Sequence, residues 1–287
     1  PFAAEGRRPT MRGTNNFVLN WITGTICLAV ISLLATAPAS AQSEKRTVFA
    51  QDDFHWQGHL KAGQALEVIN QNGEIEASSA TGDEARAKGM TRGNDDDREF
   101  FIEVVEYPDG VTICAVHARD KTPGRCHRGG VSSESTGWWH GSRAKINFDV
   151  QVPRGVRFHA LTTNGNVLGH NLASVVEATT TNGNVEVSTS EWASATTTNG
   201  GIRVSIGNAT WNGELEEKTT NGSVDVTLPG SAEFKLDAAT TNGGIHTDFP
   251  ITVQGSFNSK RLSGTVGAGG RELRVMTTNG GIKLMKS

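Results

Sequence analysis

The chain has 287 residues, a formal net charge of −3 at pH 7, and a glycine-rich composition with 34 glycines but a single tyrosine. It contains no block of Lys and Arg and no basic stripe with interleaved aromatic residues, which argues against nucleic acid as a partner. The length suffices for one sizeable hydrophobic core. A weakly acidic chain rich in Gly and Thr is typical of an exported β protein.

Residues 11–41 have the pattern of a secretory signal peptide. Arg12 gives a short basic region, residues 17–37 are mostly apolar, and Ala-Ser-Ala at 39–41 forms a small-residue cleavage site. We predict that residues 1–10 are upstream read-through and that 42–287 is exported to the periplasm, the outer surface or the medium. A retained membrane anchor is the alternative, because the apolar stretch is long enough to cross a bilayer. The polar QSEKRT that follows favours cleavage, after which no membrane span is expected.

One short motif recurs along the chain. The copies centre on Asn72-Gly73, Asn164-Gly165, Asn182-Gly183, Asn199-Gly200, Asn221-Gly222, Asn242-Gly243 and Asn279-Gly280. From Asn164 onwards the spacings are 18, 17, 22, 21 and 37 residues. A period near 20 is typical of a stacked array, and the spacing of 37 fits two repeats with a degenerate copy, RLSGTV at 261–266, between them.

Polar and apolar residues alternate on both sides of each Asn-Gly pair. The position six before the Asn is always apolar, and the position three after it is always β-branched: Ile75, Val167, Val185, Ile202, Val224, Ile245 and Ile282. The residues between these buried positions are mostly polar. A period of two on each side of a turn makes every copy a strand–turn–strand unit.

Two all-β architectures fit this pattern. Isolated Asn-Gly pairs between alternating strands predict hairpins, and thus a meandering sandwich. We favour a β-solenoid or β-roll, because identical Thr and Asn at successive columns are explained only if neighbours in a column touch. Asn-Gly is expected to supply the left-handed backbone of a tight corner. The Thr and Asn columns are expected to satisfy one another's hydrogen bonds, and the Thr directly before each Asn is expected to point outward.

Residues 42–150 and 151–287 differ in organisation, although 55–287 is expected to form one continuous domain. The first part holds one repeat, a predicted short strand at 85–88, and a clear hairpin at 99–118 that is placed to cap the end of the array. The second part is the repeat array. The acidic segment 93–99 lacks the order of a calcium loop and reads as a solvated loop.

Cys114 and Cys126 are the two cysteines left after the predicted cleavage. An even pair in an oxidising compartment favours a disulfide. The alternative is a metal site with His117 and His127, but this spacing is not a standard zinc pattern. We therefore expect neither a metal nor a cofactor.

The motifs GEIEA, DGVTICAVHA, a later Cys, INFDVQVPRGVRF and the TTNGNV series occur in this order. In this combination the chain resembles the bacterial putative-adhesin family of exported β-strand-repeat proteins, a domain of unknown function. The resemblance covers about 55–287. It implies a right-handed solenoid-like fold and an envelope or surface location, and it supplies no catalytic residues.

No motif indicates a reaction. The outward column of Glu67, Glu177, Glu216 and Asp237 is spread along the axis as in a solvated face, so we do not expect an enzyme; a β-helix carbohydrate-active enzyme is the least favoured alternative. Trp138, Trp139 and His140 form the most ligand-like segment, since exposed aromatics stack on sugars and anchor interfaces, although they could instead cover the end of the array. The sequence therefore predicts a non-catalytic adhesin or surface-binding module with an envelope, glycan or cell-surface partner. A self-assembling structural protein is the main alternative, because open strand edges permit self-association.

Overall fold

The computed structural model describes residues 45–49, 54–92, 100–117, 125–132, 145–253 and 258–287. The predicted read-through (1–10), the predicted signal peptide (11–41), the acidic segment 93–99 and Trp138, Trp139 and His140 lie outside the described residues.

Every regular element in the described ranges is a β-strand. In chain order the strands are β1 (Lys45–Phe49), β2 (Phe54–His59), β3 (Ala65–Ile69), β4 (Ile75–Ser79), β5 (Glu84–Arg92), β6 (Phe100–Tyr107), β7 (Gly110–His117), β8 (Arg125–His127), β9 (Gly130–Ser132), β10 (Lys145–Val152), β11 (Arg157–Leu161), β12 (Val167–Leu172), β13 (Val176–Thr179), β14 (Val185–Thr189), β15 (Ala193–Thr196), β16 (Ile202–Ile206), β17 (Glu214–Lys218), β18 (Val224–Leu228), β19 (Phe234–Asn242), β20 (Ile245–Thr247), β21 (Arg261–Val266), β22 (Glu272–Asn279) and β23 (Ile282–Lys286). The predicted all-β class is confirmed, and the strand expected at 85–88 is the longer β5.

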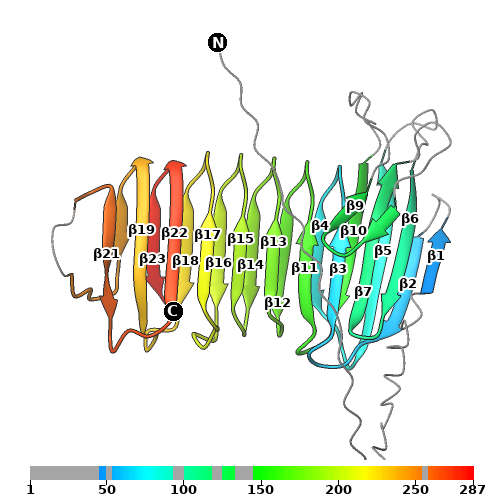
Figure 1. Ribbon diagram of the computed structural model, residues 1–287, viewed down its shortest axis with the longest axis horizontal. Coiled ribbons are helices and arrows are strands. Elements are labelled where there is room, and N and C mark those ends of the chain that lie inside the picture. The colour runs from blue at the N-terminus through cyan, green and yellow to red at the C-terminus, as the bar shows by residue number, and fades with distance from the viewer. Residues whose placement is uncertain (1–44, 50–53, 93–99, 118–124, 133–144, 254–257) are drawn as a thin grey trace, which may run out of the picture. The chain divides into compact units, whose positions relative to one another are not determined.

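Two large sheets form a solenoid. Sheet A has the order β1-β6-β7-β3-β11-β13-β15-β17-β22-β19-β21, and sheet B the order β2-β5-β10-β4-β12-β14-β16-β18-β23-β20. Each Asn-Gly corner joins one strand of sheet A to one strand of sheet B, and these corners form the aligned row of arches along the top of Figure 1. Successive rungs pair in parallel, with Phe158 opposite Val176 and Val167 opposite Val185. The solenoid is therefore confirmed over the hairpin sandwich.

The core lies between the two sheets and is built from columns of equivalent residues. The apolar position six before each Asn is buried in every rung, as shown by Leu66, Phe158, Val176, Ala193, Leu215, Leu236 and Leu273. The β-branched position after the corner is buried in six rungs and half-buried at Ile245 in the terminal one. Neighbouring rungs cover one another's apolar faces, which is why no rung is a stable unit by itself.

An asparagine ladder runs the length of the corner row. Along the axis from Asn72 to Asn242, the side-chain amide Nδ2 of each later corner Asn donates to Oδ1 of the Asn on the preceding rung, at 2.7–2.9 Å in all six steps. The predicted asparagine column is thus confirmed as a continuous hydrogen-bonded chain.

The buried threonine column bonds differently from the prediction. The Thr two before each Asn donates its hydroxyl to the carbonyl of the corner glycine on the adjacent rung, as in Thr180 to Gly165 at 2.9 Å and Thr197 to Gly183 at 2.9 Å. The threonines therefore satisfy backbone carbonyls rather than each other. A buried carbonyl without a partner is costly, so this column stabilises every corner.

Close stacking explains the corner glycines, and the prediction of a left-handed corner was wrong. A Cβ on Gly165, Gly183, Gly200, Gly222, Gly243 or Gly280 would lie only 1.8–2.0 Å from the corner carbonyl oxygen of the adjacent rung. Of the seven corner glycines only Gly73 has a positive φ, and no corner asparagine has one. Glycine is required here because one backbone passes directly over another.

The order of the last rungs also differs from the prediction. The β22–β23 rung, which carries Asn279, lies between the rungs of Asn221 and Asn242, and RLSGTV forms β21, an antiparallel edge strand beside β19. Trp211 is buried in the loop before β17 and donates its indole N–H to the Glu272 carbonyl. Its own backbone carbonyl accepts Arg271 Nε at 2.6 Å. These two bonds fix the start of β22 beside β17.

Both ends of the corner row are closed by other parts of the chain. At the first rung Asn70 replaces the buried Thr and donates Nδ2 to the Ile146 carbonyl of β10 at 2.7 Å. At the last rung the Gly243 carbonyl accepts Nζ of Lys260 at 2.6 Å, in place of a threonine from a further rung. The predicted hairpin, β6–β7, extends sheet A beyond β3, with β1 outside it.

The predicted disulfide between Cys114 and Cys126 is present. It ties the short β8–β9 hairpin to the outer face of sheet A, where both cysteines are buried with Ile69, Val105 and Val116 in a second small core. The two cysteines are therefore not available as metal ligands.

Glu217 lies in the core column that is otherwise Ala or Val. Its side chain is fully buried; Oε2 accepts the Ala195 N–H at 2.9 Å, and Oε1 has no hydrogen-bond partner among the described residues. Burial raises its pKa well above the ordinary value, because a charged carboxylate would be poorly solvated there. Sequence comparison of the repeats already singles out this residue as the one charged member of its column.

We expect Gly183→Ala to lower the free energy of unfolding by about 1–3 kcal/mol, because the new methyl group would collide with the Gly165 carbonyl. Gly201→Ala, at the residue that follows the corner glycine of the next rung, is the control: its Cβ would approach nothing closer than 3.5 Å. Urea unfolding followed by circular dichroism measures both. Equal stability of the two variants would contradict the stacking argument.

We expect Glu217 to make the protein less stable as pH rises. The folded state binds the Glu217 proton more tightly than the unfolded state. The contribution of this proton to the free energy of unfolding is therefore fully present below the unfolded pKa, and it is lost as the pH rises to the raised pKa of the folded state. Glu217→Gln should match the wild type near pH ~4 and exceed it in unfolding free energy by a growing margin up to pH ~8. Glu216→Gln, on the outer face, is the control, and a margin independent of pH would refute the assignment.

Candidate interaction surface

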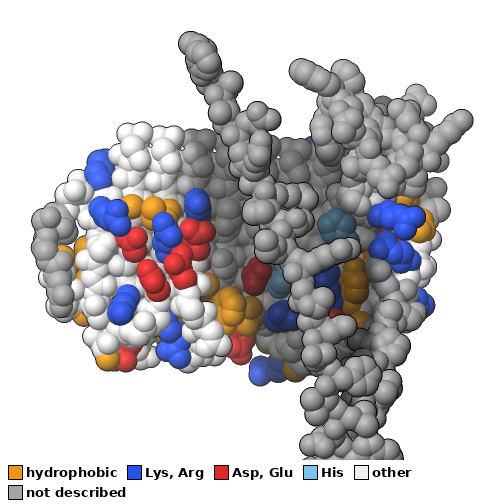
Figure 2. All heavy atoms as spheres, in the orientation of Figure 1, with side chains coloured by type: hydrophobic (Ala, Val, Ile, Leu, Met, Phe, Trp, Pro, Cys, Tyr) orange, Lys and Arg blue, Asp and Glu red, His pale blue; other side chains and the backbone are white. Residues whose placement is uncertain are grey.

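The outer face of sheet A carries a network of ion pairs over the C-terminal strands. Figure 2 shows Lys, Arg, Asp and Glu side chains gathered there. Arg274 lies 3.6 Å from Glu214 and 3.9 Å from Glu216, and Arg261 lies 3.2 Å from Asp237. Because β22 lies between β17 and β19, Arg274 stands opposite both Glu216 and Asp237 and separates these two carboxylates.

The predicted outward column is interrupted at its N-terminal end. Glu67 is buried, with only 7% of its surface exposed, beneath the disulfide-tied β8–β9 hairpin. Its carboxylate accepts the Thr112 hydroxyl at 2.9 Å and the Gly129 N–H at 3.0 Å. The expectation that Glu67 belongs to a solvated face was therefore wrong, because the sequence pattern gave no sign that β8–β9 folds over it.

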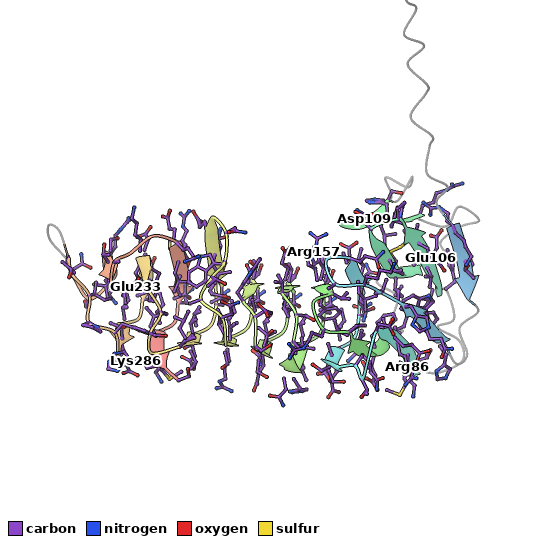
Figure 3. The ribbon with its side chains drawn as sticks, turned by 90° about the horizontal axis from the view of Figure 1, so that it is seen from below. Arg86, Glu106, Asp109, Arg157, Glu233 and Lys286 are labelled. Atoms are coloured by element: carbon purple, nitrogen blue, oxygen red, sulfur yellow. A yellow bond between two sulfur atoms is a disulfide. The ribbon has the colours of Figure 1, made fainter. Side chains whose placement is uncertain are left out.

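A second charged cluster lies at the turn between β6 and β7. Arg128 pairs with Asp109 and stacks over the ring of Tyr107, 4.3 Å from its centroid. The hydrogen bond from Arg128 holds the pKa of Asp109 below its ordinary value, with a smaller contribution from the charge of Arg157. In Figure 3 Arg157 and Glu106 project from sheet A on one side of the solenoid, and Arg86 and Lys286 from sheet B on the other.

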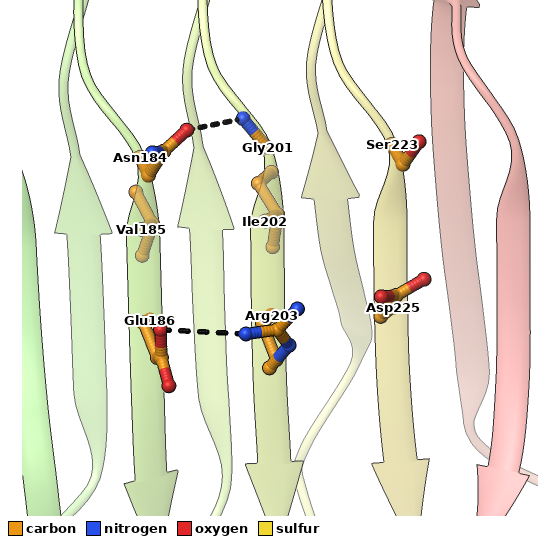
Figure 4. A pocket seen from close by; sticks show the side chains of 8 residues that line it. All are labelled: Asn184, Val185, Glu186, Gly201, Ile202, Arg203, Ser223 and Asp225. Atoms are coloured by element: carbon orange, nitrogen blue, oxygen red, sulfur yellow. Dashed lines mark hydrogen bonds and ion pairs between the residues drawn. The ribbon is translucent and has the colours of Figure 1, made fainter.

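The outer face of sheet B alternates in charge along the axis. Glu186, Arg203, Asp225 and Lys283 stand opposite one another on successive strands, and Arg203 lies 3.6 Å from Glu186. Three of these charged residues help to line a depression of about 210 Å³ on the same face. Its full lining is Asn184, Val185, Glu186, Gly201, Ile202, Arg203, Ser223 and Asp225 (Figure 4). It lies on the outer face of sheet B, where the Gly201 N–H donates to Asn184 Oδ1 at 2.8 Å, and its polar lining suits polar contacts rather than the enclosure of a substrate.

The third outward surface is the corner edge. We use this name for the Thr-Asn pairs Thr163-Asn164, Thr181-Asn182, Thr198-Asn199, Thr220-Asn221, Thr278-Asn279 and Thr241-Asn242, in their order along the axis. All twelve residues are exposed. The predicted outward orientation of these threonines is confirmed, and the predicted contact residues Trp138, Trp139 and His140 stay a prediction.

Within the described ranges no group of three or more His, Cys, Asp or Glu side chains lies close enough together to hold a metal ion. The same ranges contain no helix long and apolar enough to cross a membrane.

Comparisons with known proteins bear on the family. A protein described as a "putative cell adhesion protein" from Clostridium sporogenes ATCC 15579 is 12% identical, with a TM-score of 0.45 over 82% of this chain and 100% of its own. A "putative adhesin" from Bacteroides fragilis NCTC 9343 is 11% identical, with a TM-score of 0.30 over 83% of this chain and 98% of its own. Among curated proteins, none matches this chain.

The family itself is identified from the sequence. The model of the Toastrack DUF4097 family matches residues 59–285, which include both the N-terminal hairpin and the whole repeat array. The resemblance drawn from the repeat motifs is thereby confirmed, and the chain belongs to the Toastrack DUF4097 family.

Proposed function

We propose that the protein is an exported, non-catalytic binding module of the cell envelope or cell surface, as an adhesin would be. The observation that carries this proposal is the seven-rung stack, which holds three long outward surfaces in fixed register. The inter-rung asparagine and threonine bonds immobilise these surfaces before any partner arrives. A preordered surface loses little conformational entropy on binding, which favours affinity.

The use of the outward carboxylates supports a non-catalytic role. Glycoside hydrolysis needs two carboxylates that face one scissile bond. Here Glu216 and Asp237 are separated by Arg274, and Glu177 lies 3.8 Å from His159 on the neighbouring strand. Glu216 and Asp237 are engaged in ion pairs with Arg274 and Arg261 on neighbouring strands, which is a structural use of charge on a sheet surface.

The closed ends of the solenoid weigh against the self-assembling alternative. End-to-end stacking would need a corner that offers its glycine carbonyl to a threonine of the next molecule. At the last rung Lys260 already occupies the Gly243 carbonyl, and at the first rung Ile146 stands over Gly73, where a Cβ would be 2.0 Å from its carbonyl oxygen. Growth at either end would first have to displace these contacts.

We expect the purified protein to bind saturably to at least one component of an array of envelope polysaccharides, peptidoglycan and host glycans. A Trp138→Ala/Trp139→Ala variant tested beside it reports whether the predicted aromatic segment takes part. A blank array from protein shown to be folded by circular dichroism would count against a binding module.

We expect a single sedimenting species whose size does not grow with protein concentration, because both ends of the corner row are occupied. Sedimentation velocity over a hundredfold concentration range tests this. Lys260→Ala frees the Gly243 carbonyl, and Lys286→Ala is the matched control on sheet B. Filament-like growth of the wild type would overturn the proposal in favour of the structural alternative.

A further inference from the structure

The corner edge is a regular array of hydrogen-bonding groups. Six exposed Thr-Asn pairs repeat once per rung, and adjacent rungs in a sheet lie about 4.8 Å apart, so the pairs span about 24 Å. Figure 1 shows the corners in one straight row from β11 to β19. Such an edge presents the same pair of groups at constant spacing along the axis.

The polar groups of this edge keep hydrogen-bonding capacity that the protein does not use. Each internal Asn is held on both sides, as Asn199 is by Asn182 at 2.9 Å and Asn221 at 2.7 Å. An amide has two donor hydrogens and an acceptor oxygen with two lone pairs, so each such Asn keeps one donor and one acceptor site for a partner. The six threonine hydroxyls have no hydrogen-bond partner among the described residues, and each can both donate and accept.

The six Thr-Asn pairs themselves carry no charge and no large apolar side chain, and Lys260 lies only at the end of the row, on the Gly243 carbonyl. The residues that follow the corner glycines in these rungs are Asn166, Asn184, Gly201, Ser223, Gly281 and Gly244. The charged columns Glu186–Arg203 and Glu216–Arg274 lie instead on the outer faces of the two sheets. A partner that covers this edge must therefore supply hydrogen bonds at every rung, because buried hydroxyls and amides left unpaired oppose binding.

A neutral, linear, hydroxyl-rich polymer has these properties. We infer that the corner edge binds an uncharged linear glycan that lies parallel to the solenoid axis, with hydroxyl groups of successive sugars bonded to the Thr and Asn of successive rungs. This inference rests on the proposed binding function and names the surface and the partner class for it. An anionic polymer would be drawn to cationic side chains such as Arg203 and Lys283 on sheet B, so it fits this edge less well.

The test uses retention of the purified protein on insoluble chitin, on insoluble cellulose and on immobilised polygalacturonate, the last as an anionic comparison. The variant Thr181→Val/Thr198→Val/Thr220→Val removes three adjacent hydroxyls and keeps the β-branched shape. The matched control Thr179→Val/Thr196→Val/Thr227→Val makes the same change on the outer faces of the sheets. Circular dichroism and urea midpoints confirm that both variants fold.

We expect retention on at least one neutral polymer, with a dissociation constant weakened about tenfold or more by the edge variant and less than about twofold by the control. Binding should be insensitive to salt between ~50 and ~500 mM, because no charges take part. Retention on polygalacturonate alone, or equal weakening of binding by both variants, would refute the binding of a neutral glycan at the corner edge. Neither result would contradict the proposed function as a binding module. Absence of retention on all three polymers would also refute glycan binding at the corner edge. The proposed binding function is tested separately, by the array of envelope polysaccharides, peptidoglycan and host glycans.

Discussion

The fold depends on how closely one corner backbone passes over the next. Along the row, the carbonyl oxygen of one corner glycine lies where the Cβ of the next would be, about 2 Å away. At that distance only glycine fits, and the carbonyl becomes accessible to a threonine hydroxyl two residues before the asparagine. The asparagine amides are brought into contact by the same approach. Glycine, threonine and asparagine therefore form one structural unit, and the motif TTNG recurs because the corners stack at this short distance.

This constraint also accounts for the way the array ends. At the last rung the corner glycine carbonyl has no threonine to fill it, and at the first rung the residue in the threonine column has no glycine carbonyl to bond, so both rungs need a substitute for the missing neighbour. The chain provides Ile146 at one end and Lys260 at the other. Residues that look irregular in the sequence, such as Asn70 in a threonine column, occur at these ends because the partner there is a different kind of segment. Because both ends of the corner row are occupied, the long sides of the solenoid are the surfaces available to partners.

The rung itself could be predicted from the sequence, but the order of rungs could not. The alternation around each Asn-Gly pair determines which residues are buried, and the identical columns determine that copies touch. Because the copies are alike, the motif does not say which copy follows which, and a chain that turns back after β20 places Asn279 beside Asn221. Likewise, nothing in the period revealed that β8–β9 would cover Glu67, since that contact depends on a disulfide and on segments outside the repeat. The candidate contact surface was only partly predictable, because the outward threonines follow from periodicity whereas their freedom from partners depends on the three-dimensional neighbours.

Electrostatics gives a reason for the observed rung order. In chain order Glu216 and Asp237 would stand opposite each other on adjacent strands of sheet A, and like charges in that position are destabilising. The inserted rung places Arg274 between them, and on sheet B it places Lys283 between Asp225 and His246. The inserted β22–β23 rung therefore places a cation beside a carboxylate on the outer faces of both sheets. Since the corner residues are the same in every rung, they cannot choose between the two orders, and the choice falls to the outward columns and to the Trp211 contacts with Arg271 and Glu272. The charged faces thus specify how the solenoid is assembled, which leaves the uncharged corner edge as the surface whose exposed hydroxyls serve no purpose inside the fold.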